Sequence, residues 1–152
     1  MYKLQREQYL PISPEKAWDF FSSPKNLAKI TPPDLGFKIV SGATEDTMRE
    51  GQIIEYIVKP LLHIPIRWKS RIENVEKPGH FKDIQLVGPY KVWEHSHHFV
   101  AVEGGVKMID QLNYQLPAGI FGRLMHFLFV RKRIEFIFEY RFAVLEKLFV
   151  KA

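Results

Sequence analysis

The segment "LPISPEKAWDFFSSPKNLAKITPP" (residues 10–33) contains two helix starts close together. In each start a serine directly precedes a proline, Ser13 before Pro14 and Ser23 before Pro24. A serine hydroxyl can cap the first turn of a helix, and the fixed φ angle of proline suits the first helical position. The segment therefore predicts two short helices, and the paired prolines at its end stop the second one.

Outside this segment the pattern is mostly alternating. Residues 3–12 have strand character, and a helical pattern runs from about 121 to 149. Between the short helices and this last pattern, turn residues separate six predicted strands, over residues 37–40, 51–61, 64–76, 80–87, 91–102 and 106–116. This order predicts an α+β fold in which a curved, seven-stranded antiparallel sheet wraps around a long C-terminal helix, with the two short helices after the first strand.

The composition indicates a globular protein with a substantial core. Of its residues, 46% are hydrophobic and 14% aromatic. The length of 152 residues favours one domain over residues 1–152. The chain has no cysteine, which excludes disulfides and thiolate metal sites. The polar start "MYKLQREQYL" lacks the apolar core of a signal peptide, so we expect a cytoplasmic protein. The net charge of +5 is spread along the chain, and we expect no nucleic-acid partner.

The stretch "KVWEHSHHFVAV" places polar residues on an apolar strand face. Because side chains alternate along a strand, Trp93, His95, His97 and Phe99 share one face, while His98 lies on the other. The bulk of Trp93 and Phe99 favours an inward orientation for their face. Two of the three histidines are therefore predicted to point into the interior.

Two hairpins are expected to bring carboxylates near these histidines. If "GPY" closes the preceding turn, Asp83 lies opposite His95. If "GG" closes the following turn, Tyr114 also lies opposite His95. The predicted inward row is then Asp83, His95 and Tyr114, with His97 and Asp110 about one pair along.

The opening segment looks like the first strand and paired helices of bacterial members of the START and Bet v 1-like superfamily. The stretches "DIQLVGPYKVWEHSHHF" and "MIDQLNYQLPAGIFG" resemble a subgroup usually called ligand-binding or cyclase-like. The resemblance covers the whole chain and implies a helix-grip fold. Its members include lipid-transfer domains, the birch pollen allergen, polyketide cyclases and coenzyme Q-binding proteins, so the resemblance does not name one ligand.

The leading hypothesis is a protein that binds a hydrophobic small molecule, such as a lipid, a quinone or a polyketide-like compound, between the sheet and the last helix. Such pockets are mostly apolar with a few placed polar groups. The predicted ligand-binding residues are Trp68, Asp83, Gln85, Trp93, His95, His97, Phe99, Met108, Asp110, Tyr114 and Met125. A buried Asp83 and His95 pair without any ligand is the purely structural alternative.

An enzyme of the cyclase or dehydratase type is the functional alternative, with His95 as acid or base, Asp83 orienting it and Tyr114 as a second proton donor. His95 and His97 with Asp83 or Asp110 also match the two-histidine, one-carboxylate set that zinc or non-haem iron accepts. That spacing is common by chance in strands, and the resembled superfamily mostly binds organic ligands. We therefore expect no metal and no cofactor.

The C-terminal helical pattern is apolar over more than one stripe. Its large apolar residues include Phe121, Leu124, Met125, Leu128, Phe129, Phe136, Phe138 and Tyr140. We expect core burial for most of them. The basic residues beside them, Arg123 and residues 131–133, leave a dimer contact or a transient membrane-surface contact open, and the sequence does not decide the oligomeric state.

Overall fold

The computed structural model describes residues 1–43, 47–60 and 62–151. In these residues the strands form one antiparallel sheet of seven, in the order β1-β7-β6-β5-β4-β3-β2. The strands are β1 (Tyr2–Leu10), β2 (Lys38–Ser41), β3 (Ile53–Val58), β4 (Ile66–Glu76), β5 (His80–Val87), β6 (Val92–Val102) and β7 (Gly105–Gln115). The predicted α+β fold is confirmed. The end of the strand predicted over residues 51–61 lies outside the described residues.

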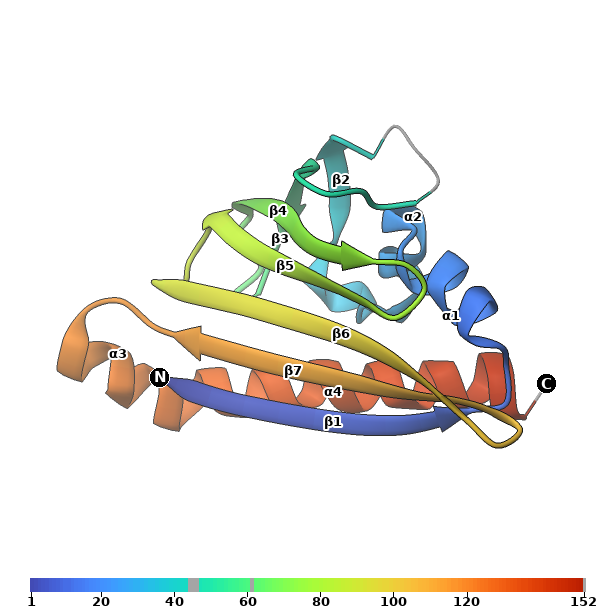
Figure 1. Ribbon diagram of the computed structural model, residues 1–152. Coiled ribbons are helices and arrows are strands. Elements are labelled where there is room, and N and C mark those ends of the chain that lie inside the picture. The colour runs from blue at the N-terminus through green and yellow to red at the C-terminus, as the bar shows by residue number, and fades with distance from the viewer. Residues whose placement is uncertain (44–46, 61, 152) are drawn as a thin grey trace.

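The helices fall into two groups. After β1 come α1 (Pro14–Phe21), α2 (Pro24–Leu27), η1 (Ala28–Ile30) and η2 (Pro33–Leu35). The C-terminal run consists of α3 (Gly119–Met125), η3 (His126–Val130), α4 (Arg131–Leu145) and η4 (Glu146–Val150). Figure 1 shows the sheet curving around α4, with α1 and α2 near the end of that helix. Within the described ranges, none of the helices combines the length and the apolarity needed to cross a membrane.

The two predicted serine caps differ in the structure. The Ser13 hydroxyl accepts a hydrogen bond from the backbone N–H of Lys16 at 3.1 Å, as an N-cap does. The second helix begins at Pro24 as predicted, but Ser23 makes no such side-chain bond, so the prediction that its hydroxyl caps the helix is wrong. Its backbone carbonyl accepts instead from the N–H of Asn26, which closes a tight turn at the start of a four-residue helix.

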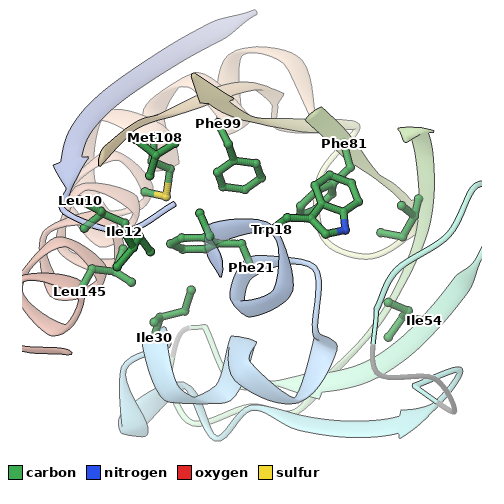
Figure 2. Packing of buried hydrophobic residues seen from close by; sticks show 13 residues of the cluster. Leu10, Ile12, Trp18, Phe21, Ile30, Ile54, Phe81, Phe99, Met108 and Leu145 are labelled. Atoms are coloured by element: carbon green, nitrogen blue, oxygen red, sulfur yellow. The ribbon is translucent and has the colours of Figure 1, made fainter. Parts of the chain in front are cut away.

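An aromatic cluster packs α1 against the sheet. Trp18 meets Phe81 and Phe99 edge to face, with ring centroids 5.8 and 6.3 Å apart, and Phe21 stacks on Phe99 at 5.3 Å (Figure 2). Trp18 and Phe81 are each only 1% exposed. This packing closes one end of the space between the sheet and α4.

The strand register confirms one prediction and corrects the other. Asp83 lies opposite His95, as predicted. In the next hairpin, however, the turn consists of residues 103 and 104, and Gly105 already belongs to β7. His97 is therefore paired with Asp110, and the predicted pairing of His95 with Tyr114 is wrong by two residues.

The reason for the shift is the neighbouring strand β1. A Cβ atom on Gly105 would lie 2.2 Å from the carbonyl oxygen of Leu10. Gly105 is thus the position that allows β1 to approach β7, while Gly104 takes the turn conformation with a φ of 76°. The inward face is unchanged, because a shift of two residues preserves side-chain alternation.

The C-terminal run buries a narrower stripe than predicted. Its buried residues recur every three or four positions: Gly122, His126, Val130, Ile134, Phe138, Arg141 and Leu145. Core burial is wrong for six of the predicted apolar residues, which are exposed: Phe121, Leu124, Met125, Leu128, Phe129 and Phe136. A sheet that curves around one side of a helix leaves the opposite side uncovered.

Candidate functional site

A cavity of about 180 Å³ lies between the sheet, α4 and the segment from α1 to η2. Apolar side chains from all three make up most of its wall. Five of the residues predicted to bind a ligand line it: Trp68, Asp83, Trp93, His95 and His97.

Aromatic rings form one side of the cavity. The Trp68 ring stacks on Tyr56 at 5.9 Å and meets Trp93 edge to face at 5.1 Å. The indole N–H of Trp68 donates to the Ser70 hydroxyl at 3.0 Å, so this buried donor is satisfied within the wall. The flat surfaces that remain suit an apolar, preferably planar, ligand.

The polar end of the cavity is a cluster of two histidines, two carboxylates and one guanidinium. His95 Nε2 lies 2.9 Å from Asp110 Oδ1, and His97 Nε2 lies 3.1 Å from Asp83 Oδ2, both as hydrogen bonds. A terminal nitrogen of Arg141 lies 3.8 Å from the same oxygen of Asp110. Asp83 and His95, which are paired across the two strands as predicted, lie close together, with 3.7 Å between Asp83 Oδ2 and His95 Nδ1. The hydrogen bond of Asp83, however, is with His97.

The two carboxyl groups of this cluster are held as anions. Burial opposes ionisation of Asp110, but Arg141 and the two histidines outweigh it and hold the pKa of this carboxyl well below its usual range. Burial likewise opposes ionisation of Asp83, yet the hydrogen bond from His97 and the other nearby cations lower its pKa. Both carboxyl groups are consequently anionic at neutral pH.

The two histidines differ in their tendency to take up a proton. Burial, followed by the charge of His97, lowers the pKa of His95. Burial also acts to lower the pKa of His97, but its contacts with Asp110 and Asp83 outweigh burial and raise it. His97 therefore takes up a proton more readily than His95, and that proton would offset the second of the two anionic charges beside Arg141.

Two buried nitrogen atoms of the cluster lack a hydrogen-bond partner among the described residues. They are His97 Nδ1 and Arg141 Nε. His97 Nδ1 lies only 3.2 Å from Asp110 Oδ1, but the angle is unsuitable for a hydrogen bond. Buried polar atoms without a partner are uncommon, and both belong to residues that line the cavity.

Sequence reasoning missed Arg141, although a signal for it exists. Arg141 lies three residues after Phe138 and four before Leu145, so it shares their buried helical stripe. A charged residue on such a stripe is rarely buried without a partner. Here the partner is Asp110, and the guanidinium also lies over the ring of Phe21 at 5.7 Å.

The other predicted residues lie around the cavity rather than on its surface. Gln85 holds the turn before β6 through hydrogen bonds with the backbone of Tyr90. The Tyr114 hydroxyl lies 2.7 Å from Nε2 of His126, in a buried hydrogen bond away from the histidine pair. Phe99 and Met108 lie in the hydrophobic core, and Met125 lies on the exposed surface of its helix. Asp110 is buried behind the two histidines.

Solved structures with the same architecture have low sequence identity to this chain. TTHA0849 from Thermus thermophilus is 21% identical, with a TM-score of 0.73 over 96% of this chain and 95% of that one. CV1439 from Chromobacterium violaceum is 13% identical, with a TM-score of 0.72 over 98% of both chains. Ara h 8.0201, a Bet v 1 homologue, is 13% identical, with a TM-score of 0.59 over 96% of this chain and 98% of that one.

Comparison with protein-family models gives no match, and comparison with curated proteins gives none either. The likeness to solved structures therefore concerns the fold, and it agrees with the resemblance noted in the sequence. With seven antiparallel strands curved around a long C-terminal helix, this chain has the helix-grip fold of the Bet v 1-like proteins.

Proposed function

We propose that the protein binds a hydrophobic small molecule in the cavity between the sheet and α4. The observation that carries this proposal is an apolar, aromatic-walled cavity with a hydrogen-bonding cluster at one end. Binding pockets for small molecules have this character, a mostly apolar lining with a few polar groups that fix orientation. The Tyr114 hydroxyl of the alternative enzyme hypothesis is bonded to His126, which leaves His95 without the expected second proton donor.

The size of the cavity narrows the class of ligand. Its volume of about 180 Å³ is close to the roughly 150 Å³ of an engineered apolar cavity that binds benzene. The ligand body enclosed here is therefore one or two rings or a short chain, with a polar atom directed at Asp83, His95 and His97. A longer tail, as in a lipid or a quinone, has to extend beyond the enclosed part.

Calorimetric titration with 2-naphthol tests this proposal. This probe has a planar two-ring body and one hydroxyl group, which match the aromatic wall and the polar end. We expect saturable binding of one probe per chain. Ile137→Trp should abolish it, because Ile137 lines the cavity from α4 and the larger side chain fills the space.

Leu148→Trp is the matched control, since Leu148 is 42% exposed at the end of the same helical run and does not line the cavity. It should bind 2-naphthol like the unmodified protein. Equal affinities of both variants would place the probe elsewhere and overturn the proposal. Absence of saturable binding in the unmodified protein would do the same.

An anionic lipid surface is a second proposed partner, supported by a separate observation. The outer side of α3 and η3 exposes a patch of large apolar residues, consisting of Ile120, Phe121, Leu124, Met125, Phe127, Leu128 and Phe129. Exposed Arg123 and Lys132 flank it, and residues 119–134 include no acidic residue. A second copy of the chain would bring like charges together, whereas anionic lipids supply both apolar chains and opposite charge.

Vesicle sedimentation tests this partner. Vesicles of phosphatidylcholine with phosphatidylglycerol should bind the protein, and salt should weaken binding. Phe127→Asp, at a residue 75% exposed, should reduce binding, while Val100→Asp on the outer face of β6 should not. Unchanged binding by Phe127→Asp, or a dimer that this substitution dissociates, would refute the lipid proposal.

A further inference from the structure

Three potential metal-ligand atoms converge at the polar end of the cavity. They are Asp83 Oδ2, His95 Nδ1 and His97 Nε2. The carboxylate oxygen lies 3.7 Å from His95 Nδ1 and 3.1 Å from His97 Nε2, and ligand atoms of the three residues fit within 4.8 Å of one another. Zinc bonds of about 2.0–2.1 Å in a tetrahedron hold the ligands roughly 3.4 Å apart. The two distances from the Asp83 oxygen to the histidine nitrogens are therefore close to those between ligands of a metal site.

Asp110 orients both histidines for this role. Its Oδ1 atom accepts from His95 Nε2 at 2.9 Å and lies 3.2 Å from His97 Nδ1. A histidine that gives its N–H on one side to a carboxylate presents the lone pair of its other nitrogen to a metal. Asp110 therefore acts on the far nitrogen of each ring, and both near nitrogens face Asp83.

The unpartnered Nδ1 atom of His97 is an independent observation that fits the same arrangement. In the metal-free cluster, the hydrogen bond of His97 to Asp83 uses Nε2. If Nε2 instead gives its lone pair to a metal ion, His97 is neutral and its single N–H is at Nδ1. That N–H then has an acceptor close by, because Asp110 Oδ1 lies 3.2 Å from His97 Nδ1.

We propose that Asp83, His95 and His97 bind one divalent transition-metal ion, zinc or iron(II), with its open positions facing the cavity. Two histidines and one carboxylate are a recognised ligand set for such ions. All three residues line the cavity, whereas Asp110 lies behind them. This proposal departs from our expectation from the sequence that no metal binds, and it rests on the convergence of these atoms.

The charge of the filled site indicates the polar group of the ligand. A divalent ion with Asp83, Asp110 and Arg141 carries a net charge of +1 when both histidines are neutral. An oxyanion such as a carboxylate, a phenolate or an enolate would neutralise it at an open coordination position. This assignment of ligand class rests on the proposed function, whereas metal binding itself does not.

Titration of the EDTA-treated full chain with Co²⁺, followed by its visible absorption, tests the metal site. We expect a 1:1 complex that Zn²⁺ displaces. Asp83→Asn and His97→Ala should lose it, and Asp110→Asn should weaken it about 10- to 100-fold. Circular dichroism of each variant establishes that the fold is retained, and Asp83→Asn is the mildest change.

The histidine pair on the outer face provides the matched control. His80 and His98 stack with ring centroids 4.4 Å apart and are the nearest surface histidines to the site in β5 and β6. His98→Ala should keep the Co²⁺ complex unchanged. Loss of the complex in His98→Ala, its retention in folded Asp83→Asn, or no 1:1 complex in the unmodified protein would overturn the proposal.

The 2-naphthol titration on metal-free protein separates this inference from the proposed function. Binding of 2-naphthol without binding of Co²⁺ would reject the metal site alone. Binding of Co²⁺ without binding of 2-naphthol would reject the apolar ligand, and with it the assignment of an oxyanionic ligand, but would keep the metal site.

Discussion

Asp110→Ala should strongly destabilise the structure around the cavity. The Asp110 side chain is almost completely buried, and its Oδ1 atom faces His95, His97 and Arg141 at 2.9, 3.2 and 3.8 Å. Removing one partner of a buried ion pair costs about 3–5 kcal/mol, because the remaining charge has no compensation. Typical domains have only about 5–15 kcal/mol of stability, so this loss is a large fraction.

Urea denaturation of the EDTA-treated protein measures this loss. We expect the free energy of unfolding to fall by about 3–5 kcal/mol, and the melting temperature to fall by roughly 10 °C, at about 2–4 °C per kcal/mol for a chain of this size. Asp19→Ala is the control, because Asp19 is an exposed carboxylate on α1 and surface changes stay within about 0.5 kcal/mol.

A second substitution, Arg141→Met, tests why Asp110→Ala lowers the free energy of unfolding. In the Asp110→Ala background it removes the uncompensated cation and should recover part of the stability. A loss below about 1 kcal/mol for Asp110→Ala, or no recovery in the double variant, would refute the argument that Asp110 balances buried positive charge.

Other predictions concern stability. Ser13→Ala should lower the free energy of unfolding by about 1 kcal/mol, while Ser23→Ala should have a smaller effect because its side chain caps nothing. Gly105→Ala should destabilise more than Gly79→Ala in thermal melts, since its Cβ would overlap backbone of β1, whereas Gly79 has ordinary contact distances. Ile134→Ala, at a residue 2% exposed, should cost about 2–5 kcal/mol in the same urea assay. Equal losses within either matched pair, or a negligible loss at Ile134, would contradict these assignments.

The fold could be predicted because local signals agree along the whole chain. The cap at Ser13, the period of two in the strands and the long final helical pattern each indicate the element that forms. The inward face of β6 was predictable for the same reason, because bulky Trp93 and Phe99 share a side with His95 and His97.

The hydrogen bonds of the site could not be predicted to the same extent. The pairing of His97 with Asp110 depends on which residues form the turn between β6 and β7. Gly105 belongs to β7 rather than to the turn and packs closely against β1, which is almost a hundred residues away in sequence. Arg141 joins the cluster from the last helix, and only the packing of that helix against β7 brings it to Asp110. Long-range contacts, not local pattern, fix these partners.

The exposed patch on α3 and η3 is a further case of this limit. Residues such as Phe121 and Phe127 indicate an apolar helix, but not how much of its circumference the sheet covers. In the structure, the sheet covers the side of Val130 and Ile134 and leaves the opposite side open.

A crystal structure of the protein grown with 2-naphthol tests the central claim most directly. The proposal predicts that the two rings of the probe lie between α4 on one side and the sheet residues Trp68 and Trp93 on the other. The oxygen of the probe should lie within hydrogen-bond or metal-bond distance of the cluster of Asp83, His95 and His97. A probe bound only on the outer surface of α3 and η3, with the cavity filled by protein side chains, would contradict it.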